Sequence, residues 1–342
     1  MRRPIALVVA AAAAVAAPAA AQTPVPSGTT PPSTTTPPPV APPVPPVPQV
    51  PAPGALSIVL KKVTGSPAAV LSGDRVRVEG TVAPYVAGQQ VVVRLYRGTT
   101  KVVSRRVAVR PGSDGATGTF LLGLRTTGRG HLVVRASHRA TAEQATMVAK
   151  AHGLDVLPRS VAPGARGAGV RLLQSRLRRL GYVVGARGLY DARTARAVLA
   201  FRKVTGLART ETATSDMMRR LVRGAGRFKI RFPKHGKHVE ADLSLQVMAL
   251  IKGGKVDRIY PISSGKPSTP TVLGTFRVYS KTPGTNAKGM VFTSYFHGGY
   301  GIHGYAEVPV YAASHGCLRE PVPDAVSIFR WISYGDLVDV YT

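Results

Sequence analysis

Cysteine is almost absent from this chain of 342 residues, which contains only Cys317. A single cysteine excludes an internal disulfide, so the folded parts must be stabilised by packing. A lone cysteine is in general a buried and chemically inert side chain. In an exported protein, however, an odd cysteine implies an intermolecular bridge or a free thiol. The neighbours of Cys317 therefore decide between an inert and a reactive cysteine.

Acidic residues are also scarce. The chain has 16 Asp and Glu against 46 Lys and Arg, which gives a formal net charge of +30. Such a charge favours a polyanionic partner. No zinc-finger spacing or aromatic RNA-binding signature accompanies the basic residues, and arginine is spread along the chain rather than gathered in one stripe. We therefore expect no nucleic acid as partner, and an anionic cell-wall polymer or a membrane surface fits better.

Apolar runs in the chain fall short of the roughly 18 residues that a membrane-spanning helix needs. An apolar run over residues 5–17 follows Arg2 and Arg3 and is closed by Pro18. With the small residues 19–21 it forms the pattern of a secretory signal peptide cleaved before Gln22. Residues 1–21 thus predict export to the cell envelope, in the periplasm or cell wall. Retention as an uncleaved anchor is the alternative.

Residues 22–54 are rich in proline and threonine and cannot form a core. Repeated Pro-Pro and Val-Pro steps favour an extended polyproline conformation. The segment is interpreted as a linker, either a spacer of defined reach or a disordered leader.

Residues 55–157 predict an all-β domain. Polar and apolar residues alternate over 75–82, as in a half-buried strand, and shorter strands are expected at 91–96, 102–109, 119–124 and 131–136. Turn residues such as those at 72–74 and 111–115 separate them. This spacing predicts an immunoglobulin-like β-sandwich. Nothing in it suggests catalysis, so a spacer or adhesion role is expected.

The periodicity becomes helical in residues 163–224. Val170, Leu173 and Leu177 form one apolar stripe, Asp191 is a natural N-cap for a second helix, and a third is expected at 215–222. The sequences GVRLLQSRL (169–177), LGY (180–182) and GLYD (188–191) resemble a peptidoglycan-binding domain, which implies a small three-helix bundle. The family usually has Gln where this chain has Arg202.

Residues 228–342 predict a β-rich domain. Strands are expected at 241–250, 256–262, 274–279 and 337–341, and a helix from Pro323 or Asp324 to Trp331. The fold class is therefore multidomain and mainly β, with a sandwich, a helical bundle and this C-terminal domain.

Cys317 has the surroundings of a nucleophile. A thiol reacts as thiolate, and because its free pKa is about 8.5 it needs a base such as His303 or His315. Glycines beside it leave backbone N–H groups open to a developing oxyanion. No histidine follows Cys317, whereas papain-like enzymes place theirs after the cysteine. A zinc site from His297, His303, His315 and Cys317 is a disfavoured alternative, since the usual paired spacing is absent. No metal or other cofactor is expected.

The sequences GIHG (301–304) and SHGCLR (314–319) resemble the signature of the L,D-transpeptidase family, as do VEADLS (239–244), ISSGKPSTP (262–270) and LGTF (273–276). The resemblance implies a β-rich catalytic domain that acts on peptidoglycan stem peptides. Family members form a thioester, release a terminal D-residue and pass the acyl group to an amine, which leaves a 3–3 crosslink.

The resemblance also assigns roles to residues of this chain. Cys317 is implied as nucleophile and His303 as general base. The Gly304 carbonyl would orient the imidazole, in the manner of a triad aspartate. The amides of Gly316 and Cys317 are candidate oxyanion donors. The supporting residues and the cleft candidates are Ser314, His315, Arg319, Tyr300 and Tyr295.

Some roles and reactions stay open. His315 either contacts the substrate or supports the oxyanion site, or it braces the turn that presents the thiol; the supporting role is favoured. Tyr300 and Tyr295 either line the cleft or simply pack. Cell-wall L,D-transpeptidation is the leading hypothesis for function. Hydrolysis by the same residues (an L,D-carboxypeptidase) and a catalytically silent wall-binding scaffold are the alternatives.

Overall fold

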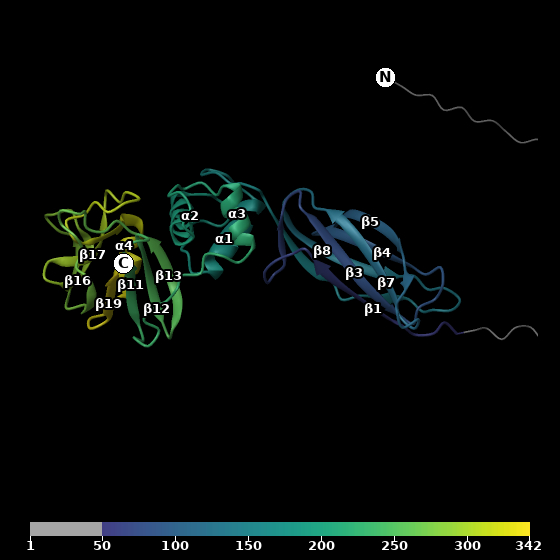
Figure 1. Ribbon diagram of the computed structural model, residues 1–342. Helices are drawn as coiled ribbons and strands as arrows, with labels where there is room; N and C mark the ends of the chain where they lie inside the picture. The colour runs from purple at the N-terminus through teal and green to yellow at the C-terminus, as the bar shows by residue number, and fades with distance from the viewer. Residues whose placement is uncertain (1–49) are drawn as a thin grey trace, which may run out of the picture. The chain divides into compact units, whose positions relative to one another are not determined.

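The computed structural model describes residues 50–342 (Figure 1). The predicted signal peptide and most of the predicted linker lie outside the described residues. None of the helices within 50–342 is long and apolar enough to cross a membrane.

Two sheets form the predicted β-sandwich (Figure 1). One sheet has the order β1 (Ala55–Lys61), β3 (Arg75–Ala83), β7 (Gly118–Arg125) and β6 (Arg110–Pro111). The other has the order β2 (Ala69–Leu71), β10 (His152–Leu157), β8 (Gly130–His138), β4 (Gln90–Arg97) and β5 (Thr100–Ala108), and β9 (Met147–Val148) pairs with β8. Alternate residues such as Val78 and Val93 are fully buried in one core between the sheets. The sequence pattern identified five of these strands but missed the other five, β1, β2, β6, β9 and β10.

Three helices follow, as predicted. They are α1 (Ala168–Arg179), α2 (Ala192–Val204) and α3 (Ser215–Val222). The apolar stripe of α1 is buried, and Asp191 caps α2 by accepting a hydrogen bond of 2.9 Å from the Thr194 N–H. Arg202 is buried, and its guanidinium donates to the carbonyl of Ala208 and to the hydroxyl of Thr214. The departure from the family pattern at Arg202 thus braces the loop between α2 and α3.

The C-terminal domain is also built from two sheets. The larger has the order β13 (Lys255–Pro261), β12 (Val247–Lys252), β11 (His238–Asp242), β19 (Leu337–Tyr341) and β14 (Gly274–Arg277). The smaller has the order β15 (Ser280–Thr285), β16 (Val291–His297), β17 (Tyr300–Tyr305) and β18 (Leu318–Pro321), and helix α4 (Val322–Trp331) follows β18 directly. Residues from both sheets and from α4, among them Leu250, Ile302 and Ile328, share one core.

Two strand predictions in this domain were wrong in extent. Residues 241–250 are a hairpin rather than one strand, because the Asp242 carboxylate accepts hydrogen bonds from the Leu245 N–H and the Ser244 hydroxyl. Gln246 then adopts a φ of 58°, a left-handed conformation that ends any extended run. The strand expected at 274–279 ends at Arg277.

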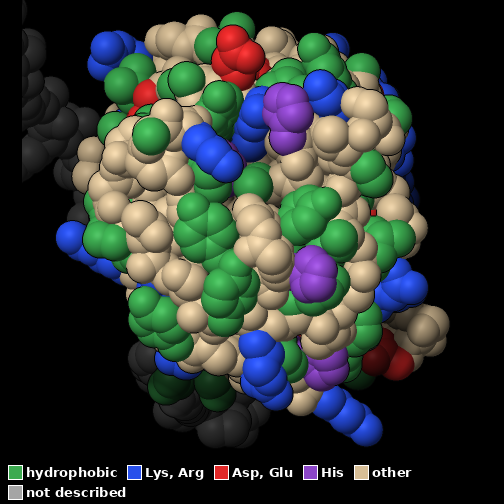
Figure 2. Space-filling view, turned by 90° about the vertical axis from the view of Figure 1, so that its left-hand side faces the viewer, with side chains coloured by type: hydrophobic (Ala, Val, Ile, Leu, Met, Phe, Trp, Pro, Cys, Tyr) green, Lys and Arg blue, Asp and Glu red, His purple; other side chains and the backbone are tan. Residues whose placement is uncertain are grey.

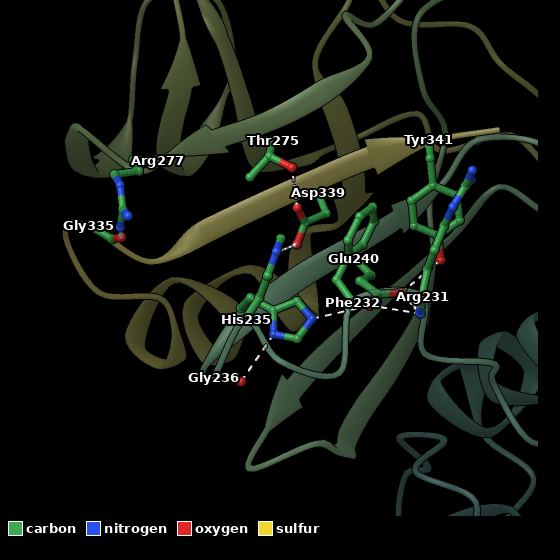
Figure 3. A network of polar contacts seen from close by, with 11 residues as sticks. Arg231, Phe232, His235, Gly236, Glu240, Thr275, Arg277, Gly335, Asp339 and Tyr341 are labelled. Carbon is green, nitrogen blue, oxygen red and sulfur yellow. Dashed lines mark hydrogen bonds and ion pairs between the residues drawn. The ribbon is translucent and has the colours of Figure 1, made fainter.

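Buried carboxylates fasten the segment that leads into this domain (Figure 3). Glu240 on β11 accepts hydrogen bonds of 2.9 and 2.7 Å from the backbone N–H groups of Arg231 and Phe232. Asp339, its partner on β19, lies 3.0 Å from His235 Nδ1. The chain is therefore held against the larger sheet before the first strand begins.

Candidate active site

Cys317 and His303 come from two neighbouring strands of the smaller sheet. Strands β17 and β18 are parallel, and their register pairs His303 with Arg319. Paired residues project from the same face of a sheet, and so do residues two apart on one strand. His303 and Arg319 therefore share one face, and Cys317 lies in the turn that leads directly into β18. Ile302 and Leu318 project from the other face into the core.

Figure 2 shows the C-terminal domain from the side of β16 and β17. Apolar side chains gather over the middle of this face, with lysine, arginine and histidine side chains around them and few acidic ones in view. The surface thus combines an uncharged centre with a cationic border.

The imidazole of His303 is buried, with 2% of its surface exposed. Its Nδ1 lies 2.9 Å from the carbonyl oxygen of Gly304. Because a carbonyl only accepts, Nδ1 carries the ring proton and Nε2 has a free lone pair. Burial lowers the pKa of His303, the Gly304 hydrogen bond opposes this, and the charge of Arg319 lowers it further. His303 is thus held as a neutral imidazole, the form a general base requires.

Gly304 has no room for a side chain. A Cβ at this position would lie 2.7 Å from the Cβ of Ala325 and 3.1 Å from the Cα of Val322. Helix α4 therefore packs directly on the backbone that orients His303.

The Cys317 thiol is in its protonated form at rest. Its Sγ lies 3.7 Å from the carbonyl oxygen of Gly299, to which it donates a weak hydrogen bond. Burial raises the pKa of Cys317, whereas the Gly301 N–H and the charges of Arg319 and Lys288 lower it in part. The raised pKa of the thiol and the lowered pKa of the imidazole each favour the neutral form of the group.

A tight turn presents the thiol. The Ser314 hydroxyl donates to the Cys317 carbonyl at 2.6 Å and accepts from the Gly316 N–H at 3.0 Å. Gly316 has a φ of 114°, and a Cβ there would lie 2.0 Å from the ring of Tyr300. Glycine is therefore required, and Tyr300 packs on the turn. The hydrogen bond to Ser314 occupies the Gly316 N–H, which weakens this amide as a candidate oxyanion donor.

The charge of Arg319 acts on both His303 and Cys317. Its guanidinium carbon is 4.1 Å from the centre of the Tyr305 ring, a cation–π contact. Its backbone exchanges two hydrogen bonds of 3.0 Å with Ser263. Tyr305 was missed by the sequence reasoning, although its place two residues after His303 on a strand was a usable signal. Ser263 and Lys288 gave no such signal.

The other predicted residues have contacts of their own. His315 is exposed, with Nε2 3.5 Å from Lys266 Nζ. His297 stacks beside Tyr300, and the Tyr295 hydroxyl lies 3.5 Å from the Asn286 amide. Among residues 50–342 no three His, Cys, Asp or Glu side chains are placed to share a metal ion.

Family models match two parts of the chain. Residues 236–340 match the L,D-transpeptidase catalytic domain, and residues 166–221 match a peptidoglycan binding domain. These ranges contain the candidate active site and all of the three helices except the last residue of α3. No curated protein matches the chain.

Solved structures give similar sequences. An L,D-transpeptidase from Xylanimonas cellulosilytica is 32% identical over 54% of this chain and 98% of that chain, with a TM-score of 0.49. The catalytic domain of an Enterococcus faecium L,D-transpeptidase is 31% identical over 31% of this chain and 98% of that chain, with a TM-score of 0.28. A mutant of an E. faecium enzyme is 29% identical, with a TM-score of 0.28, over 31% of this chain and 50% of its own length, so the present chain spans half of that protein. By its identity to relatives that it covers almost completely, the chain belongs to the L,D-transpeptidase family.

Proposed function

We propose that the protein is an exported enzyme that crosslinks peptidoglycan stem peptides, with Cys317 as nucleophile and His303 as general base. The observation that carries the proposal is the hydrogen bond between His303 Nδ1 and the Gly304 carbonyl. It leaves Nε2 free to accept a proton, and Cys317 immediately precedes β18, the strand that pairs with the strand of His303. A thiol with a raised pKa needs such an acceptor.

The first half-reaction forms a thioester. Sγ of Cys317 attacks the carbonyl that joins the third residue of the donor stem to its terminal D-residue, while His303 Nε2 takes the thiol proton. The oxyanion of the tetrahedral intermediate faces the Cys317 N–H, the remaining candidate donor. The C–N bond then breaks, the protonated His303 returns the proton to the departing amine, and the D-residue leaves.

The second half-reaction transfers the acyl group. A side-chain amine of a neighbouring stem attacks the thioester carbonyl and loses a proton to His303. The C–S bond breaks and the thiolate recovers that proton. The product is a 3–3 crosslink. Arg319, which lowers the pKa of both reactive groups, and Tyr300, which packs on the Gly316 turn, support this chemistry.

We assign the remaining regions to delivery and retention. In this proposal residues 1–21 direct export, 22–54 form a linker, 55–157 act as a spacer or adhesion module, 163–224 hold the wall, and 228–342 catalyse. The formal charge of +30 suits an anionic wall polymer or a membrane surface as a further partner.

The test is a mass-spectrometric assay with soluble tetrapeptide-stem muropeptides. The wild-type protein should yield 3–3 dimers, Cys317→Ala should yield none, and His303→Gln should lose about 10²–10⁴-fold in rate, the usual contribution of a general base. The matched control is His152→Gln, in the N-terminal sandwich, which should retain the wild-type rate. Dimers that persist in Cys317→Ala would contradict the proposal, and tripeptides without dimers would indicate a carboxypeptidase instead.

A further inference from the structure

Lys203, near the end of helix α2, is a buried lysine whose side chain reaches into the C-terminal domain. Only 3% of its surface is exposed. Its Nζ donates hydrogen bonds to two backbone carbonyls, that of Gln246 at 3.0 Å and that of Ile262 at 3.1 Å. Among residues 50–342 no carboxylate forms an ion pair with it. The ammonium is therefore stabilised by backbone carbonyls alone.

Burying a charged lysine at this position is unfavourable in free energy. Burial, aided by repulsion from Arg209, lowers the pKa of Lys203 to about 7. An amine keeps at least two N–H donors whether it is charged or neutral, so both carbonyls remain satisfied on either side of that pKa. An apolar side chain would fill the same space but would leave two buried carbonyls without this donor. The function of Lys203 thus lies in its donors.

Both carbonyls are connected to Ser263 and Ser264. Ile262 directly precedes these two serines in the chain, and Gln246 is hydrogen-bonded to the same segment. The Ile262 N–H donates to the Gln246 carbonyl at 3.0 Å, which closes the pair around Lys203. The Gln246 side chain then accepts from the Ser264 N–H at 2.9 Å and donates to the Ser264 hydroxyl at 2.6 Å. The Ile262 carbonyl that Lys203 binds therefore directly precedes Ser263 and Ser264, a segment fixed by both backbone and side-chain hydrogen bonds.

That segment is hydrogen-bonded to the turn of residues 314–317, which carries the Cys317 thiol (the nucleophile turn). The Ser264 carbonyl accepts from the N–H groups of Ala313 and Ser314, both at 2.9 Å, and Ser263 pairs with Arg319. Ser314 in turn bonds to the Cys317 carbonyl. A continuous series of hydrogen bonds thus runs from Lys203 in the helical region to the residue that carries the thiol.

Arg209 makes a second connection of the same kind. It follows α2 and donates to the carbonyls of Val310 and Ser244, both at 2.9 Å. Val310 lies in the loop between His303 and Ser314, and Ser244 lies in the turn before Gln246. Lys203 and Arg209 of the helical region therefore donate hydrogen bonds to the backbone at 244, 246 and 262, and at Val310, four residues before Ser314.

We propose that Lys203 is a positioning residue for Cys317, which acts through Ile262, Ser264 and Ser314 to fix the nucleophile turn. The helical region then has a role in the chemical step, in addition to any binding of the wall. This inference rests on the proposed function only where turnover is measured. The geometry of the turn can be measured without turnover.

The experiment compares full-length Lys203→Met, which removes the donors, with Lys203→Gln, which keeps two N–H donors without the charge. With soluble muropeptides, Lys203→Met should lower kcat about 10–100-fold, as a misplaced nucleophile does, with KM within about 2-fold of wild type. Lys203→Gln should recover part of that loss. Amide hydrogen exchange of residues 313–318 should accelerate in Lys203→Met and less in Lys203→Gln. The control is Arg219→Met, at an exposed cation of α3. Its kcat and its exchange of residues 313–318 should both match those of the wild-type protein.

Two results would overturn the proposal: wild-type exchange of residues 313–318 in Lys203→Met, or an exchange increase there that Lys203→Gln does not reduce. Far-UV circular dichroism and the melting temperature separate local loosening from unfolding, because general unfolding would speed exchange in α1 and α2 as well. If no variant and no wild-type protein makes dimers, the proposed function fails, while the exchange measurement still decides the role of Lys203.

Discussion

The chain contains two β-sandwiches that bury different chemistry. In residues 55–157, the buried histidine and carboxylate side chains are His138 and Asp155. The sandwich of residues 228–342 buries six: His238, Glu240, His303, Glu320, Asp324 and Asp339. Removing ionisable groups from water is unfavourable unless they gain partners. The second sandwich therefore depends on more polar interactions that are sensitive to geometry and protonation.

Most of these groups in the C-terminal sandwich have a positioning contact. Glu240 holds the entering segment through two backbone N–H groups. Asp324, at the start of α4, pairs with Arg193 and Arg196 of helix α2. His303 is oriented by a carbonyl. The first sandwich thus buries few ionisable groups, with Asp155 paired to His131 and Arg176, whereas the second buries more of them, most with specific polar contacts.

Cutting a large side chain from the apolar sandwich should have the largest effect on stability and none on catalysis. Leu154 is 1% exposed in the core of residues 55–157. Leu154→Ala should lower the free energy of unfolding of this sandwich by about 2–5 kcal/mol, because a cavity remains. Calorimetry should show one transition moved to lower temperature, and kcat with soluble muropeptides should not change.

The control for this change is Leu121→Ala on the same sandwich. Leu121 is 54% exposed, so its truncation should alter the free energy of unfolding by no more than about 0.5 kcal/mol. A fall in kcat in Leu154→Ala at temperatures below the transition would break the comparison, since it would couple the apolar sandwich to the site.

Leu154 is a buried side chain that stabilises the first sandwich. Glu320, buried in the second sandwich, should instead lower the free energy of unfolding at neutral pH. Among residues 50–342 neither carboxyl oxygen of Glu320 has a hydrogen-bond partner. Burial, with the nearby charge of Asp324, raises the pKa of Glu320 well above its ordinary value. Above the ordinary carboxyl pKa the folded state then binds more protons than the unfolded chain, so the free energy of unfolding falls as pH rises toward the folded pKa.

Glu320→Gln keeps the shape and cannot ionise. The melting temperature of the variant minus that of wild type should therefore increase as pH is raised from about 4.5 to about 8, the range above the ordinary carboxyl pKa. The same difference for Glu307→Gln, an exposed carboxyl, should stay flat with pH. A flat difference for Glu320→Gln would show that its carboxyl has found a partner or water.

The sequence could predict the parts of the fold that follow from periodicity. The stripe Val170, Leu173 and Leu177, the cap Asp191 and the alternation over 75–82 all fall in the elements they predicted. The hairpin within 241–250 was missed because apolar residues continue through it, and only the Asp242 side chain and the φ of Gln246 reveal the turn.

The candidate site was predictable only in part, for a similar reason. The motif names Cys317 and His303, and their roles stay predictions; Tyr300 lies against Gly316, which leaves its prediction as a cleft residue open. The bond that occupies the Gly316 N–H depends on the fold of the turn. The contribution of Lys203 depends on two segments, at 246 and 262, that are distant in sequence from it. Periodicity carries no information on such contacts.

The smallest predicted effect concerns Arg319, which lowers the pKa of both His303 and Cys317. Arg319→Met removes a positive charge, so both pKa values should rise. The acidic limb of kcat/KM, which reports the free base, should move to higher pH. The rate of alkylation of Cys317 by iodoacetamide, measured without substrate, should reach its midpoint at higher pH as well.

Arg330→Met, an exposed cation at the end of α4, is the matched control and should leave both curves in place. If Arg319→Met moves only the limb of kcat/KM, the arginine acts on the bound substrate rather than on the resting pair. If it moves neither curve, its charge is screened by water at this face. In that case the difference between the two sandwiches at the candidate site would rest on the burial of His303. Burial is the largest cause of the lowered pKa of this histidine.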